Sequence, residues 1–247
     1  MKSDTVATQD THAPQTAPVG TLTRRQRLLA LVLVLSISVL HFVLSSSYVV
    51  FGGTYSSGSA NQNQYRVANA LLLELTSLLL LWYVLWQQKR SWKEIGWEPS
   101  WHDPFRAIGI IVTTYVVTYP TIFFFQLIYR DVTGHYLHSL SRHGVLGLGI
   151  SVFSILFVVV NPFFEELIVR AYTMSEVIGL GSSRTLAIVV SVCIQMSYHL
   201  YQGLLNCVVV AISFVILSIY FAKTRRIMPV ILTHLFFDAY AFVRLNA

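Results

Sequence analysis

Two adjacent glutamates, two histidines and one aspartate lie in or beside long apolar runs in the second half of the chain: Glu165, Glu166, His199, His234 and Asp238. Ionisable side chains are costly inside a membrane, so their presence in apolar segments makes them candidates for function. In such a set, a carboxylate or imidazole can remove a proton from water while other polar groups stabilise the oxyanion that forms. These residue types therefore point to the activation of water.

The spacing of these residues predicts which of them share a helix face. Glu166 and Arg170 are four residues apart and can pair, whereas Glu165 points about 100° away from Glu166 and is free for another partner. His234 and Asp238 are also four apart. Each group has a purely structural alternative: a charge cluster at a helix end, or a histidine–aspartate hydrogen bond that locks a bundle.

The order of the motifs resembles that of the CAAX-protease and bacteriocin-processing family, also called the Abi family, which includes the Ras-converting CAAX endopeptidases. The motifs are EExxxR from Glu165 to Arg170, then His199, then HxxxD from His234 to Asp238. The resemblance covers roughly residues 145–243, and the segment 92–97 is similar to a glycine-containing segment of the family.

Two positions depart from the pattern of that family. Members commonly carry Phe four residues before the middle histidine, where this chain has Gln195, and many carry Asn where it has Asp238. An ionised Asp238 would repel an oxyanion, so we expect it to be protonated, hydrogen-bonded to His234 or bound to a metal.

The resemblance implies a role for each motif residue. Glu165 and His199 would activate the attacking water. His234 and Asp238 would stabilise the tetrahedral intermediate. The remaining two residues of the first motif, Glu166 and Arg170, would hold Glu165 in place.

A metal is compatible with these residues but is not required by them. The nitrogen and oxygen set of Glu165, His199, His234 and Asp238 suits Zn²⁺ or another divalent metal. However, the chain has no HExxH motif, and the same groups could act on water without a metal.

The composition predicts that these residues lie in a membrane. Of the 247 residues, 55% are hydrophobic and only 11% are charged, too few to cover a water-soluble globule. We expect an all-α bundle of seven spans, or eight if 163–179 forms its own helix, because backbone groups in lipid must be paired within each segment. The seven apolar runs are 28–51, 67–86, 107–128, 145–164, 185–200, 204–222 and 227–243.

The predicted organisation has three parts: a disordered cytosolic tail (1–27), N-terminal helices with an interfacial segment (28–144), and a catalytic core (145–243). Lys and Arg concentrate on one side when the spans alternate, which predicts a cytosolic N-terminus in a multi-pass plasma-membrane protein, most simply a bacterial one. The net charge of +6 therefore reflects topology and lipid headgroups, and nucleic acid is not an expected partner.

Two further features of the sequence bear on the site. Glu74 lies in the second predicted span, where helix packing through a hydrogen bond is the default expectation. His199 lies about 21 Å along the fifth predicted helix, whereas Glu165 lies near the inner surface. The motifs can meet only if that helix is tilted, begins below the membrane or breaks at mid-bilayer.

The leading hypothesis is an intramembrane endopeptidase that cleaves a membrane-anchored peptide or protein, such as a prenylated CAAX-type or bacteriocin-related substrate. The alternative is a bacteriocin self-immunity protein that acts by binding. A small transporter would also explain buried carboxylates, but the chain has no inverted repeat. The oligomeric state is open.

Overall fold

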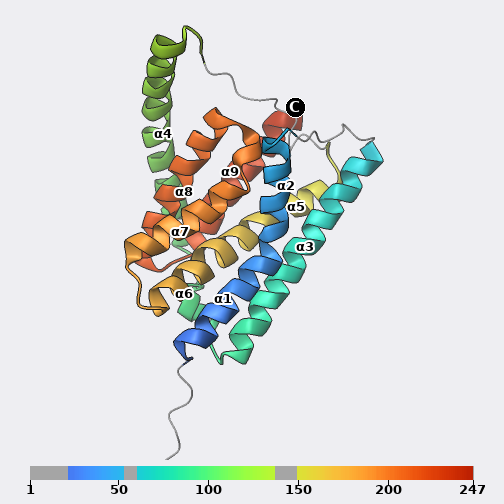
Figure 1. Ribbon diagram of the computed structural model, residues 1–247, viewed down its shortest axis with the longest axis vertical. Coiled ribbons are helices and arrows are strands. Elements are labelled where there is room, and N and C mark those ends of the chain that lie inside the picture. Colours follow the sequence, from blue (N-terminus) through green and yellow to red (C-terminus); the bar gives the residue numbers. More distant parts are fainter. Residues whose placement is uncertain (1–21, 53–59, 137–148, 247) are drawn as a thin grey trace, which may run out of the picture.

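The computed structural model describes residues 22–52, 60–136 and 149–246, and all the regular structure within these ranges is helical (Figure 1). The all-α prediction is therefore confirmed. Most of the predicted N-terminal tail, residues 1–21, lies outside the described ranges. The first helix, α1 (Arg24–Ser38), takes up residues 24–27 of that tail, because Thr23 and Gln26 form a reciprocal capping box at its start.

The described residues contain five helices long and apolar enough to cross a membrane, or six if α1 and α2 (Leu40–Val50), bent by 52° at their junction, make one span. The five lie within α3 (Ala60–Gln87), α4 (Asp103–Thr133), the stretch Val152–Gly179, α8 (Leu204–Thr224) and α9 (Met228–Asn246). The chain is thus an integral multi-pass membrane protein.

The predicted count of seven spans is too high because the fifth apolar run forms a short helix. This helix, α7 (Arg184–Ser197), has 14 residues and is about 21 Å long, less than the roughly 30 Å of a hydrocarbon core. The optional eighth span is also wrong, since 163–179 continues the preceding helix in one apolar stretch of 28 residues.

That continuous stretch changes its helical form in the middle. It begins as α5 (Val152–Phe164), becomes a π-helix, η2 (Glu165–Tyr172), and ends as α6 (Thr173–Gly179). Pro162, just before the change, has no N–H to donate to the preceding turn. All eight π-helical residues are buried, and π segments are frequent at functional sites. The first motif therefore lies in a widened helix at the centre of the molecule.

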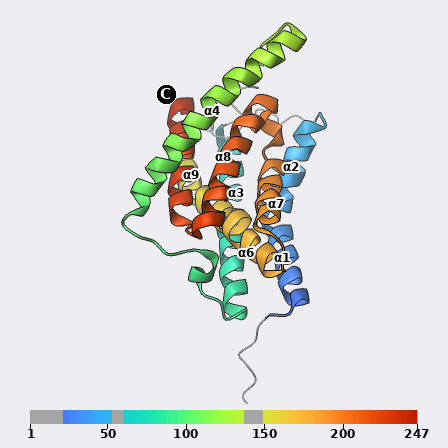
Figure 2. The ribbon, with the colours of Figure 1, turned by 90° about the vertical axis from the view of Figure 1, so that its left-hand side faces the viewer.

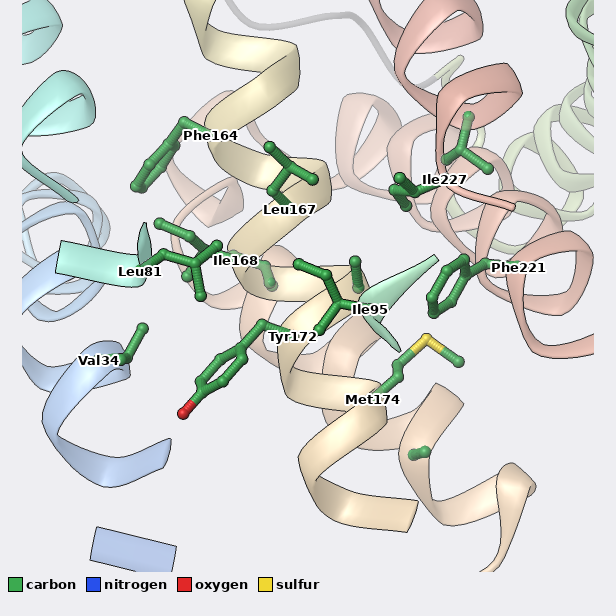
Figure 3. Packing of buried hydrophobic residues seen from close by; sticks show 14 of the residues in the cluster. Val34, Leu81, Ile95, Phe164, Leu167, Ile168, Tyr172, Met174, Phe221 and Ile227 are labelled. Atoms are coloured by element: carbon green, nitrogen blue, oxygen red, sulfur yellow. The ribbon is translucent and has the colours of Figure 1, made fainter. Parts of the chain in front are cut away.

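The hydrophobic core surrounds this central segment (Figure 3). Ile168 and Tyr172 of η2 meet side chains from α1, α3 and α8, as well as a short 3₁₀ helix, η1 (Trp92–Ile95). The partners drawn in Figure 3 include Val34, Leu81, Ile95 and Phe221. Helices distant in sequence thus hold η2 from several sides.

Charged side chains join several connections at one end of the bundle. Glu176 of α6 is fully buried and pairs with Arg27 of α1 and with Arg90, which follows α3. Arg225, between α8 and α9, donates to the carbonyl of Glu94 and to the hydroxyl of Ser175. Figures 1 and 2 show these connections at the end of the bundle where α1 begins.

Candidate active site

The two glutamates at the start of η2 are both buried, but their partners differ. Glu166 is fully buried, pairs with Arg170, and accepts a hydrogen bond of 2.7 Å from Nδ1 of His234 on α9. Glu165 lies one residue earlier, with its Oε2 4.0 Å from Nε2 of His234. Glu166 therefore orients His234, in addition to the pairing with Arg170 that the sequence predicted.

Arg170 is fully buried and well partnered. Besides Glu166, its Nη2 donates to Oε1 of Gln195 at 2.6 Å and its Nε donates to Oγ of Ser218 at 3.1 Å. Its guanidinium also lies over the ring of Phe214, 5.8 Å from the centroid. A buried charge is tolerated when it is paired and hydrogen-bonded in this way. Gln195, the first departure from the family pattern, thus ties α7 to Arg170.

His234 and Asp238 share one face of α9, as their spacing predicted. Oδ1 of Asp238 is 3.6 Å from Nε2 of His234, longer than a hydrogen bond, whereas Oδ2 accepts a hydrogen bond of 3.0 Å from Nδ2 of Asn161. Asn161 is not among the site residues that the motifs predict. The available signal was its position four residues before Glu165, as a polar residue in an apolar run.

His199 lies in the turn that follows α7, before a short 3₁₀ helix, η3 (Leu200–Gln202). Its Nδ1 is 2.8 Å from the carbonyl oxygen of Gln195. A carbonyl only accepts, so Nδ1 carries the proton and Nε2 keeps a lone pair that can act as a base.

His199, the middle motif residue, is connected to the other two motifs by contacts with the ring of Phe214. Phe214 of α8 lies 5.1 Å from the ring of His199 and 6.3 Å from the ring of His234, measured between centroids. The depth conflict noted in the sequence is resolved because the short α7 breaks at the level of the site. Glu165, Glu166, Arg170, His234 and Asp238 are joined by close polar contacts, and His199 adjoins them across Phe214.

The predicted optional metal ligands do not fit a metal centre. Across residues 22–52, 60–136 and 149–246, no group of three or more His, Cys, Asp or Glu side chains is arranged to hold a metal ion. His199 and His234 each contact the ring of Phe214, at centroid distances of 5.1 Å and 6.3 Å. We therefore derive no step through a metal.

Comparison with known families gives a match that contains all of these motifs. Residues 147–240 match the family described as type II CAAX prenyl endopeptidase Rce1-like. Residues 147–240 are a domain of this family. No curated protein and no solved structure matches the chain significantly.

Membership of the Rce1-like family agrees with the resemblance drawn from the motifs. It implies a peptidase that works within the membrane on a protein substrate. In this Rce1-like domain, a buried carboxylate, a histidine held by a second carboxylate, and a histidine with a free Nε2 lie in neighbouring helices. This arrangement is suited to deprotonating a water molecule and to stabilising an oxyanion.

Proposed function

We propose that this protein is an intramembrane endopeptidase in which Glu165 is the general base. The observation that carries the proposal is the position of the Glu165 carboxylate, which is buried beside Nε2 of His234 and has an oxygen without a hydrogen-bond partner of regular geometry in the described part of the chain. Glu165 takes a proton from water, and the water oxygen bonds to the carbonyl carbon of the substrate.

The negative charge then moves to the former carbonyl oxygen. His234 is oriented by Glu166 and presents Nε2 next to Glu165, where a protonated Nε2 stabilises that oxyanion. When the carbon–nitrogen bond breaks, Glu165 returns its proton to the departing amine. His199 keeps a free Nε2 as a second proton acceptor beside the site, and Asp238, held by Asn161, lies next to His234.

The substrates we propose are peptides or proteins anchored in the membrane, such as prenylated CAAX-type or bacteriocin-related peptides. The first and last motifs lie on helices long and apolar enough to cross a membrane, and His199 follows the short apolar helix α7. A membrane-anchored substrate is already concentrated there, whereas a soluble peptide would first have to leave water.

The test is cleavage of a quenched fluorescent prenylated CAAX peptide by the detergent-purified protein. Wild type should cleave, and Glu165→Gln should lower kcat by at least about 100-fold, the scale of lost general-base catalysis. Glu94→Gln, at an exposed glutamate outside the spans, is the matched control and should behave as wild type. Full activity of Glu165→Gln would refute the assignment.

Two further measurements distinguish metal-free proteolysis from metal-dependent proteolysis and from immunity by binding. Because the motif residues do not form a metal centre, cleavage should persist in a chelator. Protection of cells against a bacteriocin that survives in Glu165→Gln would favour immunity by binding over proteolysis.

A further inference from the structure

Three buried oxygens from three different elements face the candidate site without a hydrogen-bond partner of regular geometry in the described residues. They are Oε2 of Glu165, Oε2 of Glu74 on α3, and the hydroxyl of Tyr198, which follows α7. The three residues are 4%, 1% and 8% exposed, respectively. Buried polar atoms are rarely left unpaired, so a group of three calls for a physical account.

These side chains are neighbours. The Tyr198 hydroxyl lies next to the Glu165 carboxylate. It is also close enough to Glu74 for the two groups to interact electrostatically. Glu74 is likewise close enough to interact electrostatically with Glu165, His234 and Asp238. The expected hydrogen bond between helices does not form at Oε2 of Glu74 in the described part of the chain.

The packing of the helices agrees with this placement. Helices α3 and α5 pack together and run in the same direction (Figure 1). Leu81 of α3 and Ile168 belong to the same buried core (Figure 3). Glu74 stands on α3, and Asn161, which binds Asp238, stands on α5, so two packed helices carry these residues.

The three groups offer two hydrogen-bond acceptors and one donor, a set that one water molecule can use. A buried water needs about two to four polar partners. Glu165 and Glu74 can each accept one of its two hydrogens, and the Tyr198 hydroxyl can donate to one of its lone pairs. The second lone pair then remains free to attack a carbonyl carbon.

We propose that Glu74 and Tyr198 are positioning residues that hold the attacking water against Glu165. The inference rests on the proposed function and deepens it, because Glu165 alone would accept the proton without fixing the direction of attack. Misplacement of a reacting group by about 1 Å can cost roughly 100-fold in rate. The two residues therefore contribute to turnover and not to substrate binding.

The experiment measures kcat and KM for Tyr198→Phe and Glu74→Gln in the full-length protein with the prenylated CAAX peptide. We expect kcat to fall about 10- to 100-fold in each variant, with KM within about twofold of wild type because the water, and not the peptide, is displaced. Both substitutions keep the size of the side chain.

Matched controls separate positioning from general structural damage. Tyr172→Phe removes another buried tyrosine hydroxyl that has no partner of regular geometry in the described core, one that lies near Gln88 and Glu176. Ser77→Ala alters α3 about one turn from Glu74, at a hydroxyl already bonded to the Leu73 carbonyl at 2.7 Å. Both controls should retain kcat within about twofold.

Wild-type kcat in Tyr198→Phe or Glu74→Gln, or equal losses in the controls, would overturn the inference while leaving Glu165 as the base. If wild type cleaves nothing, the proposed function fails, and the water is tested directly by a high-resolution experimental structure. Water density between the three oxygens that disappears in Tyr198→Phe supports the positioning role, and empty space there refutes it.

Discussion

At the scale of single residues, the contact between Asn161 and Asp238 is the most specific feature of the candidate site. It joins α5 to α9 through one hydrogen bond of 3.0 Å to Oδ2 of Asp238, whose Oδ1 lies 3.6 Å from Nε2 of His234. Replacing the amide of Asn161 with a carboxylate would bring two like charges together at Asp238.

We expect Asn161→Asp to lower kcat at least about tenfold, because two carboxylates would face each other inside the bundle. Asp238→Asn should retain most of the activity, since an amide oxygen can still accept from Asn161. The double variant Asn161→Asp with Asp238→Asn should recover most of the loss, with the donor and acceptor exchanged. Steady-state kinetics on the four proteins form the cycle. Additive losses in the double variant would show that the hydrogen bond is not what matters.

At the scale of elements, η1 depends on a glycine that follows it. Gly96 has φ +89°, its carbonyl accepts from the N–H of Ile227, and an added Cβ would overlap the Arg225 carbonyl and come within 2.8 Å of a Phe221 ring carbon. The chain must therefore pass very close to the connection between α8 and α9.

Gly96→Ala should destabilise the fold by at least about 2 kcal/mol, because steric overlap adds to an unfavourable backbone angle. Gly52→Ala is the matched control, since Gly52 has φ +95° with open space around its Cβ position, and it should cost about 1 kcal/mol. Thermal unfolding in detergent measures both variants. Equal losses would mean that the close approach contributes nothing.

The buried Glu176 connects three elements through its two arginines. Glu176→Gln should destabilise the protein by about 2 kcal/mol, because Arg27 and Arg90 lose the charge that compensates for their partial burial. Glu94→Gln removes an exposed carboxylate that also pairs with Arg90, at 3.3 Å, and should cost under about 1 kcal/mol. Melting temperatures of both variants provide the comparison, and a smaller loss for Glu176→Gln than for Glu94→Gln would contradict it.

At the scale of the whole molecule, the orientation in the membrane follows from the basic end of the bundle. The ion pairs of Arg27 and Arg90 and the connection at Arg225 gather at the end where α1 begins. The other end of α4, near Tyr136, lies at the opposite side of the molecule (Figures 1 and 2). The positive-inside tendency predicts that the basic end faces the cytosol.

Cysteine labelling tests this orientation in a chain whose Cys193 and Cys207 are replaced by alanine. In intact cells, a membrane-impermeant maleimide should label Tyr136→Cys and leave Lys93→Cys unlabelled until the cells are permeabilised, because both positions are exposed but lie at opposite ends of the bundle. The reverse pattern would invert the proposed topology.

The sequence by itself determined the membrane-embedded helical class and the three motifs, because apolar run length and residue spacing act within single segments. The tertiary structure decided the rest. In the folded chain α7 is shorter than a full span, His199 lies at the break after it, and Gln195, Ser218 and Asn161 are partners of charged side chains. Such hydrogen bonds join residues far apart in sequence, so only the packing of one helix against another could determine them.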